Sequence, residues 1–258
     1  MRGLRATAAV LTCVAVMGSG GCSPRSSDDG APASLTDAPV RVLAAASLTD
    51  AFQTMIDSFT AEHPEVEFAP LVTGGSQKLV QQVNEGAPAD VLALAGEENL
   101  KALTAPAADA DFRIFATNTL VIVTPKGNPK HISGLSDLAA DDVRVAVCVR
   151  QAPCGRATGK LLDTYGIAVH RPTEENNVRA TLAKAEIGEV DAAVVYRSDA
   201  LGNDAVDTVV VAEAADIVNR YPIAALSDSD AAEQFVDYVV SDKGQKILAD
   251  KGLGGPVR

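Results

Sequence analysis

The chain has 258 residues, of which 22 are Lys or Arg and 34 are Asp or Glu, so its formal net charge is −12. An acidic chain of this kind repels nucleic acid and anionic membrane surfaces at long range, and a nucleic-acid partner is therefore not expected. Hydrophobic residues make up 47% of the chain, which is enough for the cores of one large or two modest α/β domains.

The first residues have the pattern of a secretory signal peptide. Two arginines precede an apolar run at 6–17, and small residues lead to Cys22. The run is too short for a comfortable membrane span. Small residues directly before a cysteine resemble the cleavage box of bacterial lipoproteins, although Ser19 stands where that box usually has an aliphatic residue. This resemblance predicts a lipoprotein-type signal at 1–22 and an exported protein that the lipidated Cys22 anchors to the outer face of the cell membrane.

Residues 23–39 are rich in Ser, Asp, Ala and Pro without periodicity, which predicts a disordered tether.

Cysteine usage agrees with export. Cys13 leaves with the signal, and outside the cytoplasm a disulfide is the default expectation for Cys148 and Cys154. No metal site of the zinc type is expected, because the histidines are scattered without ligand spacing at His63, His131 and His170.

Residues 40–96 alternate between strand and helix patterns. Apolar runs predict strands, and apolar residues at helical spacing predict helices. In chain order these are a strand at 40–46, a helix at 48–63, a strand at 66–72, a helix at 77–84 and a strand at 91–96. This order predicts a parallel, doubly wound sheet with right-handed crossovers. Ligands of such sheets bind beyond the carboxyl ends of the strands.

A second α/β series follows an extended segment at 118–127. Its strands are expected at 143–149, 191–196 and 207–212, and its helices near 160–165 and 175–189. Another extended segment, 220–226, precedes two C-terminal helices. Two crossing segments, with the last helices returning to the first half, predict two lobes with a cleft between them. Residues 40–120 with 222–258 would form the first lobe, and residues 121–221 the second.

Hydrogen-bonding residues follow several predicted strands. They are Ser47, Ser76, the Pro-Cys-Gly turn at 153–155, Asn177 with Val178, and Tyr196. Taken singly, each has an ordinary explanation: the serines as helix N-caps, the glycines as turn residues, Tyr196 as a packed aromatic. Helix N-termini at the carboxyl edge of a sheet present free N–H groups and a positive dipole end. Together, the residues make five hydrogen-bonding positions that face one cleft, where an anion could be held.

The chain resembles the molybdate-binding proteins of bacterial ABC importers over residues 40–258. The segments that carry the resemblance are, in order, AAASLTDAF, GAPADVLALA, NTLVIVTPKG, NNVRATLAKAEIGEVDAAVVYRSDA and YPIAAL. It implies an α/β fold of the periplasmic-binding-protein type II, whose lobes are mostly parallel sheets flanked by helices and joined by two crossing strands. It also implies a monomeric binding protein, without enzymatic activity or cofactor, that delivers molybdate or tungstate to an ABC permease and its ATPase subunit.

The resemblance implies a ligand set as well. In that family, neutral donors hold a tetrahedral oxyanion, and the matching positions here are Ser47 and Ser76 for hydroxyl and N–H groups, Cys154 and Val178 for backbone N–H groups, and Tyr196 for its phenol. These donors would reach molybdenum only through the oxygens of molybdate. The family usually has alanine in place of Cys154 and a richer serine run in place of GGSQ. Since the backbone N–H is the working group at position 154, cysteine is compatible there, and a bridge to Cys148 would stiffen the loop.

Two alternatives stay open. Sulfate is a smaller tetrahedral anion that the same cage could hold with longer bonds. A secreted thiol hydrolase using Cys154 with His170 is the other, but no nucleophile elbow, phosphate loop, dinucleotide motif or zinc spacing accompanies it. An acceptor carboxylate in the cleft would select a protonated oxyanion. Asp90 is the nearest candidate and is expected to be structural.

Overall fold

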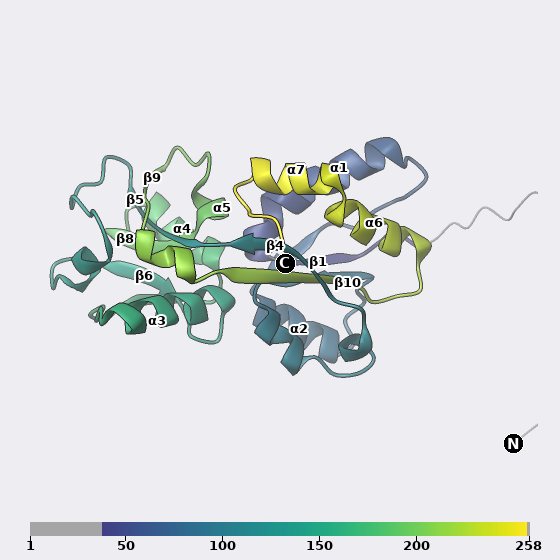
Figure 1. Cartoon of the computed structure of the whole chain (residues 1–258), viewed down its shortest axis with the longest axis horizontal. Helices are drawn as coiled ribbons and strands as arrows, with labels where there is room; N and C mark the ends of the chain where they lie inside the picture. Colours follow the sequence, from purple (N-terminus) through teal and green to yellow (C-terminus); the bar gives the residue numbers. More distant parts are fainter. Residues whose placement is uncertain (1–37, 257–258) are drawn as a thin grey trace, which may run out of the picture. The chain divides into compact units, whose positions relative to one another are not determined.

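The computed structural model describes residues 38–256, which form two lobes, each built on a five-stranded sheet (Figure 1). The predicted signal peptide, Cys22 and nearly all of the predicted tether lie outside the described residues. Within 38–256, no helix combines the length and the apolar character needed to cross a membrane.

The first lobe contains a mixed sheet in the order β2-β1-β3-β10-β4. β1 (Val42–Ala45) pairs in parallel with β2 (Val72–Gly74) and β3 (Val91–Ala93). β10 (Asn219–Ala225) runs antiparallel to β3 and to β4 (Arg113–Asn118). The three parallel strands place their carboxyl ends at one edge, as the βαβ pattern predicts.

Helices cover both faces of this sheet (Figure 1). α1 (Thr49–Glu62), α6 (Asp230–Val240) and α7 (Asp242–Asp250) lie on one face, and α2 (Ser76–Asn84) lies on the other. Successive residues of a strand point to opposite faces, so Val42 joins the core beneath α1 while Leu43 joins the core beneath α2. Aromatic rings fill the first of these cores, with Phe52 edge-on to Phe115 at a centroid distance of 5.9 Å.

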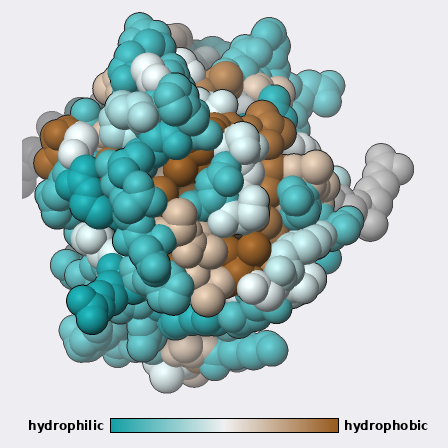
Figure 2. Space-filling model, turned by 90° about the vertical axis from the view of Figure 1, so that its left-hand side faces the viewer, coloured by the Kyte–Doolittle hydropathy of each residue, from teal (hydrophilic) through white to brown (hydrophobic). Residues whose placement is uncertain are grey.

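The second lobe has a mixed sheet in the order β7-β6-β8-β5-β9. Its strands are β5 (Leu120–Pro125), β6 (Val145–Cys148), β7 (Thr173–Glu175), β8 (Ala192–Tyr196) and β9 (Val206–Val209). β6 is parallel to β7 and β8, and β5 is antiparallel to β8 and β9. Its helices are α3 (Pro153–Tyr165), α4 (Val178–Glu186) and α5 (Arg197–Ala200). Mostly hydrophilic residues cover the end of this lobe, around a few apolar ones (Figure 2).

The chain passes from the first lobe to the second between β4, at the edge of its sheet, and β5, next to the edge strand β9. β4 ends in the first sheet at Asn118 and β5 begins in the second sheet at Leu120, so Thr119 alone makes the first crossing. The expected crossing segment 118–127 is thus mainly a strand of the second lobe. The chain returns to the first lobe directly before β10, so the expected crossing segment 220–226 is mainly a strand of the first sheet. Short 3-10 helices fill several connections, at η1 (Ala46–Leu48), η2 (Glu97–Ala102), η3 (Ala107–Asp109), η4 (Leu135–Ala139) and η5 (Ala212–Asp216).

Several element boundaries differ from the sequence-based expectations. The strand expected at 66–72 is found at 72–74, and Phe68 makes only an isolated bridge to Val40. α3 begins at Pro153 rather than near 160, because proline is well suited to the first helical position. β4 and β7 were not expected. The predicted residue boundaries of the lobes stay a prediction.

Candidate ligand-binding site

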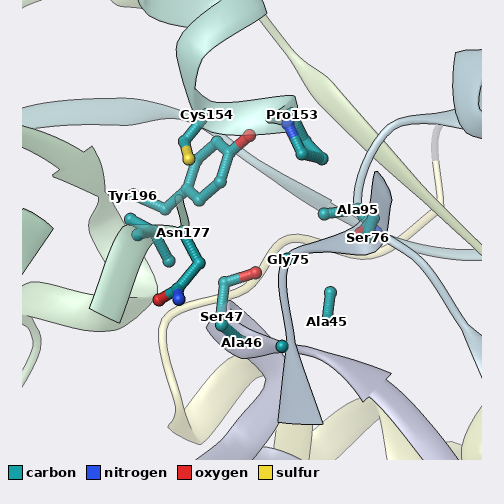
Figure 3. Close-up of a pocket in the computed structure, with 12 residues that line it drawn as sticks. Ala45, Ala46, Ser47, Gly75, Ser76, Ala95, Pro153, Cys154, Asn177 and Tyr196 are labelled. Atoms are coloured by element: carbon teal, nitrogen blue, oxygen red, sulfur yellow. Dashed lines mark hydrogen bonds between the residues drawn. The ribbon is translucent and has the colours of Figure 1, made fainter. Parts of the chain in front are cut away.

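A small cavity lies between the two lobes, and strand ends and helix starts form its walls (Figure 3). All five residues of the expected ligand set line it. The first lobe contributes Ala45, Ala46, Ser47, Gly74, Gly75, Ser76 and Ala95, and the second lobe contributes Pro153, Cys154, Asn177, Val178 and Tyr196. None of these side chains is charged.

Three helices of nine residues or more begin at the cavity: α2 at Ser76, α3 at Pro153 and α4 at Val178. The first backbone N–H groups of a helix have no acceptor within the helix, and the helix dipole is positive at that end. Asn177 caps α4 by accepting a hydrogen bond from the Ala180 N–H at 3.0 Å. The remaining free donors of three helix starts therefore converge on one small volume.

Neither serine is a helix N-cap, so that ordinary explanation is wrong for both. Ser76 is the first residue of α2, and its hydroxyl oxygen accepts a hydrogen bond from the backbone N–H of Ala95 at 2.9 Å. Ser47 lies inside η1, and its hydroxyl lies 3.0 Å from the hydroxyl of Tyr221. Because the Ser76 oxygen is used as an acceptor, its proton remains available to a ligand.

Tyr221 connects Ser47 to the strands that join the lobes. It lies on β10, and its oxygen accepts a hydrogen bond from Asn118 Nδ2, at the end of β4, at 3.3 Å. The same Asn118 nitrogen donates to the hydroxyl of Ser198 at 2.8 Å. With Asn118 donating to the phenol oxygen, the phenol proton is available to Ser47, and the Ser47 proton is then available to a ligand.

Tyr196 carries a buried hydroxyl that lacks a partner. The side chain is 1% exposed, and no hydrogen-bonding group among residues 38–256 reaches its Oη. Burial raises the pKa of the Tyr196 phenol well above its ordinary value, so the group is a neutral donor. A buried hydroxyl without a partner costs about 1–3 kcal/mol. Together with its place in the cavity wall, this points to a bound acceptor that completes the site.

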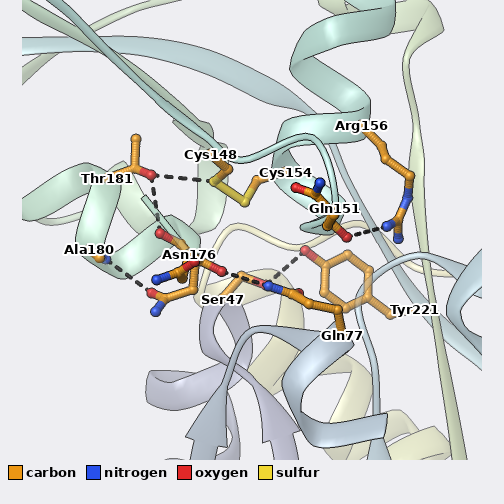
Figure 4. Close-up of a disulfide and its surroundings, with 11 residues drawn as sticks. Ser47, Gln77, Cys148, Gln151, Cys154, Arg156, Asn176, Ala180, Thr181 and Tyr221 are labelled. Carbon is orange, nitrogen blue, oxygen red and sulfur yellow. Dashed lines mark hydrogen bonds between the residues drawn. A yellow bond between two sulfur atoms is a disulfide. The ribbon is translucent and has the colours of Figure 1, made fainter. Parts of the chain in front are cut away.

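Cys148 and Cys154 are joined by a disulfide, with their Cα atoms 5.7 Å apart (Figure 4). The bridge ties the end of β6 to the second residue of α3, which carries one of the expected N–H donors. The loop packs tightly here, since a Cβ at Gly155 would lie 1.9 Å from the Val149 carbonyl oxygen. Cys154 consequently has no free thiol for the hydrolase alternative.

Other candidates lie away from the cavity. His170 faces Asp141 at 3.8 Å in a separate surface hollow. Asp90 accepts the Arg41 backbone N–H at 2.8 Å, which fits the structural role expected for it. Among the described residues, no cluster of His, Cys, Asp or Glu is arranged to hold a metal ion.

The lobes touch each other beside the cavity. Gln77 Nε2 in the first lobe donates to the Asn176 carbonyl oxygen in the second at 2.9 Å. Gly75 makes this approach possible, because an added Cβ would lie 2.7 Å from the same oxygen. Sequence reasoning missed Gly75, Asn118 and Tyr221. The double glycine at 74–75 was the only local signal for any of them.

A family model described as bacterial extracellular solute-binding protein matches residues 40–254. The molybdate-binding protein ModA of Mycobacterium tuberculosis (strain ATCC 25618 / H37Rv) is 39% identical over 220 residues, which cover 83% of this chain and 84% of the relative.

Two solved structures share the architecture. The substrate binding domain of a putative molybdenum ABC transporter from Clostridium difficile is 26% identical, with a TM-score of 0.62 and coverage of 85% of this chain and 99% of that one. The periplasmic molybdate-binding protein of Azotobacter vinelandii is 21% identical, with a TM-score of 0.71 and coverage of 84% and 100%. At 21% identity, the second likeness concerns the fold alone.

Proposed function

Since this chain belongs to the bacterial extracellular solute-binding protein family, we propose that it captures molybdate between its lobes and delivers it to the permease of an ABC importer. The observation that carries the proposal is the buried, unpartnered Tyr196 hydroxyl in a cavity lined by neutral donors from both lobes. The name of the mycobacterial relative supports molybdate as the ligand.

In the proposed complex, the hydroxyls of Ser47, Ser76 and Tyr196 and the backbone N–H groups of Ser47, Ser76, Cys154 and Val178 hold the four oxygens. Hydrogen bonds to a charged acceptor are roughly twice as strong as those between neutral groups. Helix N-termini add fractional positive charge without the cost of burying an ion pair. A cage of donors alone suits a dianion that carries no proton, whereas hydrogen phosphate would need an acceptor, and no carboxylate lines this cavity.

The negative charge of the whole chain does not oppose this role. A formal charge of −12 acts over the surface, where salt screens it within about 8 Å at physiological ionic strength. Inside the cavity, the local donors decide the affinity.

The members of this family are described as extracellular. We propose that Cys22 is the lipid attachment point that keeps this protein at the outer face of the membrane. Residues 23–39 would then serve as a tether for a monomer that meets the permease and its ATPase partner. The protein binds its ligand and carries out no reaction on it.

Thermal unfolding in the presence of single oxyanions tests the proposed ligand. A ligand that binds only the folded state, at 100 times its dissociation constant, stabilises that state by about 2.7 kcal/mol. Molybdate and tungstate, which are nearly the same size, are expected to raise the melting temperature equally. Sulfate is expected to raise it less, and phosphate least. A larger shift with sulfate than with molybdate would identify sulfate, and not molybdate, as the ligand. No shift with any oxyanion would refute the proposal.

A further inference from the structure

The proposed ligand residues Ser47, Val178 and Tyr196 are each followed by a charged residue within three positions. Asp50 follows Ser47 on α1, Arg179 follows Val178 on α4, and Asp199 follows Tyr196 on α5. These three charged side chains meet one another. Arg179 Nη2 donates to Asp50 Oδ2, and Arg179 Nε lies 3.2 Å from Asp199 Oδ1.

Of these three residues, Asp199 is the one whose side chain is fully buried. Its exposure is 0%, and among the described residues neither carboxylate oxygen has a hydrogen-bond donor in good alignment. Burial of a charge is costly unless an opposite charge lies beside it. The Arg179 guanidinium supplies that charge from within the same lobe, so above about pH 7, where the carboxyl of Asp199 is ionised, Arg179 is held in place whether or not the first lobe is near.

Arg179 also stands where a helix disfavours a cation, at the second residue of α4 and next to the positive end of its dipole. Its position is therefore not explained by the stability of α4. The pair with Asp50 joins α1 of the first lobe to α4 of the second. Among residues 38–256, it is the one ion pair that connects the two lobes.

We propose that Arg179 is a positioning residue that latches the two lobes together over the bound anion, with Asp199 as its fixed anchor and Asp50 as the partner that arrives on closure. The inference goes beyond the proposed function and rests on it only in taking an anion to be what the closed lobes hold. Because Asp50 and Ser47 share one segment, and Arg179 and Val178 share another, formation of the latch brings the donors of both lobes together.

The expected strength of the latch follows from its exposure. The side chains of Arg179 and Asp50 are 33% and 57% exposed, so solvent and salt screen their attraction. Exposed ion pairs are weak chiefly because two long side chains must be ordered, and here Asp199 has already ordered one of them. We expect about a two- to fivefold effect on the closed state.

Asp50→Asn tests the latch, with Asp57→Asn as the matched control. Both changes remove one exposed negative charge from α1, but Asp57 bonds to Gln53 on its own helix and not to the second lobe. Stopped-flow measurement with molybdate at pH 8, where Asp199 is ionised, is expected to show dissociation about two- to fivefold faster for Asp50→Asn than for the control. The association rate is expected to stay unchanged, and Asp50→Glu is expected to restore most of the loss.

Small-angle scattering at several molybdate concentrations, including zero, measures closure directly. Asp50→Asn is expected to have a larger radius of gyration than Asp57→Asn at every concentration below saturation. If scattering and dissociation are the same in both variants, the latch is refuted. Absence of any molybdate binding by the unchanged protein would instead refute the proposed function, and the ligand-free scattering would still decide on the latch.

Discussion

The hydroxyls of Tyr221 and Ser47 lie 3.0 Å apart, although 174 positions separate the two residues in the chain. Tyr221 stands on β10 beside β4, whose last residue Asn118 donates to the same phenol oxygen. The strands at which the chain passes between the lobes thus hold one of the proposed ligand hydroxyls. A change in the geometry of these strands would be transmitted to Ser47 through the Tyr221 hydroxyl, and also through Ser198, whose hydroxyl donates to the Ser47 carbonyl oxygen at 3.4 Å.

Tyr221→Phe tests this connection. The change keeps the ring, which packs edge-on against Phe115 and Tyr196, and removes only the hydroxyl. We expect the free energy of unfolding to fall by about 0.5–1.5 kcal/mol, the worth of one buried hydrogen bond. Molybdate affinity is expected to fall several-fold, because the Ser47 hydroxyl is no longer oriented. Denaturant unfolding and calorimetry measure the two effects, and full affinity in the variant would show that Tyr221 does not position Ser47.

The disulfide between Cys148 and Cys154 is expected to stabilise the folded protein modestly. Closing a loop this short, with a sequence separation of 6, is worth about 2 kcal/mol in the chain-entropy model. Replacing both cysteines by alanine is expected to lower the free energy of unfolding by about that amount. Intact mass before and after reduction and alkylation checks the bridge itself. Two free thiols in protein isolated from the cell envelope without reductant would contradict it.

Asp199 predicts a pH dependence of stability. Burial raises the pKa of its carboxyl from 3.8 to about 7, against the opposing attraction of Arg179. Between these two values, the folded protein holds a proton that the unfolded chain has released. Stability contributed by this residue is therefore fully present below pH 4 and is lost as the pH rises through 7.

Asp199→Asn is expected to remove this slope, because asparagine keeps the shape of the protonated carboxyl and does not titrate. Denaturant unfolding from pH 5 to pH 8 gives the free energies. The unchanged protein is expected to lose up to about 1.4 kcal/mol per pH unit relative to the variant. Parallel curves for the two proteins would mean that Asp199 does not titrate in this range.

Replacement of Cys22 by serine tests the proposed anchor. Membrane binding by one acyl chain is weak, so stable anchoring needs the several chains of a bacterial lipoprotein. We expect the variant to be released into the medium or to remain unprocessed. The same apparent size and the same membrane fractionation as the unchanged protein would argue against lipidation.

The sequence predicted the parts of the fold that depend on local pattern. The strand before Ser47 and the helix after it could be recognised from apolar spacing alone, and so could β8 before Tyr196. β4 was missed because its mixed polar and apolar residues lie at the edge of a sheet, where no regular burial pattern is imposed. The start of α3 was missed because Pro153 and Gly155 were interpreted as a turn.

The candidate site, too, was predicted only in part from the sequence. All five expected ligand residues line one cavity, because strand ends and helix starts meet at one edge of each sheet. Their ligand roles stay a prediction. Tyr221, Asn118 and Arg179 could not be found from the sequence, since each acts through a partner that only the folded chain brings near.

Calorimetric titration of Tyr196→Phe with molybdate tests the central claim most directly. The change keeps the packed ring and removes the one hydroxyl in the cavity wall that lacks a partner, while Tyr165→Phe at the exposed end of α3 is the matched control. Losing one hydrogen bond to a charged ligand costs about 1.5–3 kcal/mol, or roughly a ten- to hundredfold loss of affinity. We expect that loss for molybdate and tungstate alike in Tyr196→Phe, with affinity unchanged in the control. Equal molybdate affinity in Tyr196→Phe and the unchanged protein would mean that the anion does not bind in this cavity.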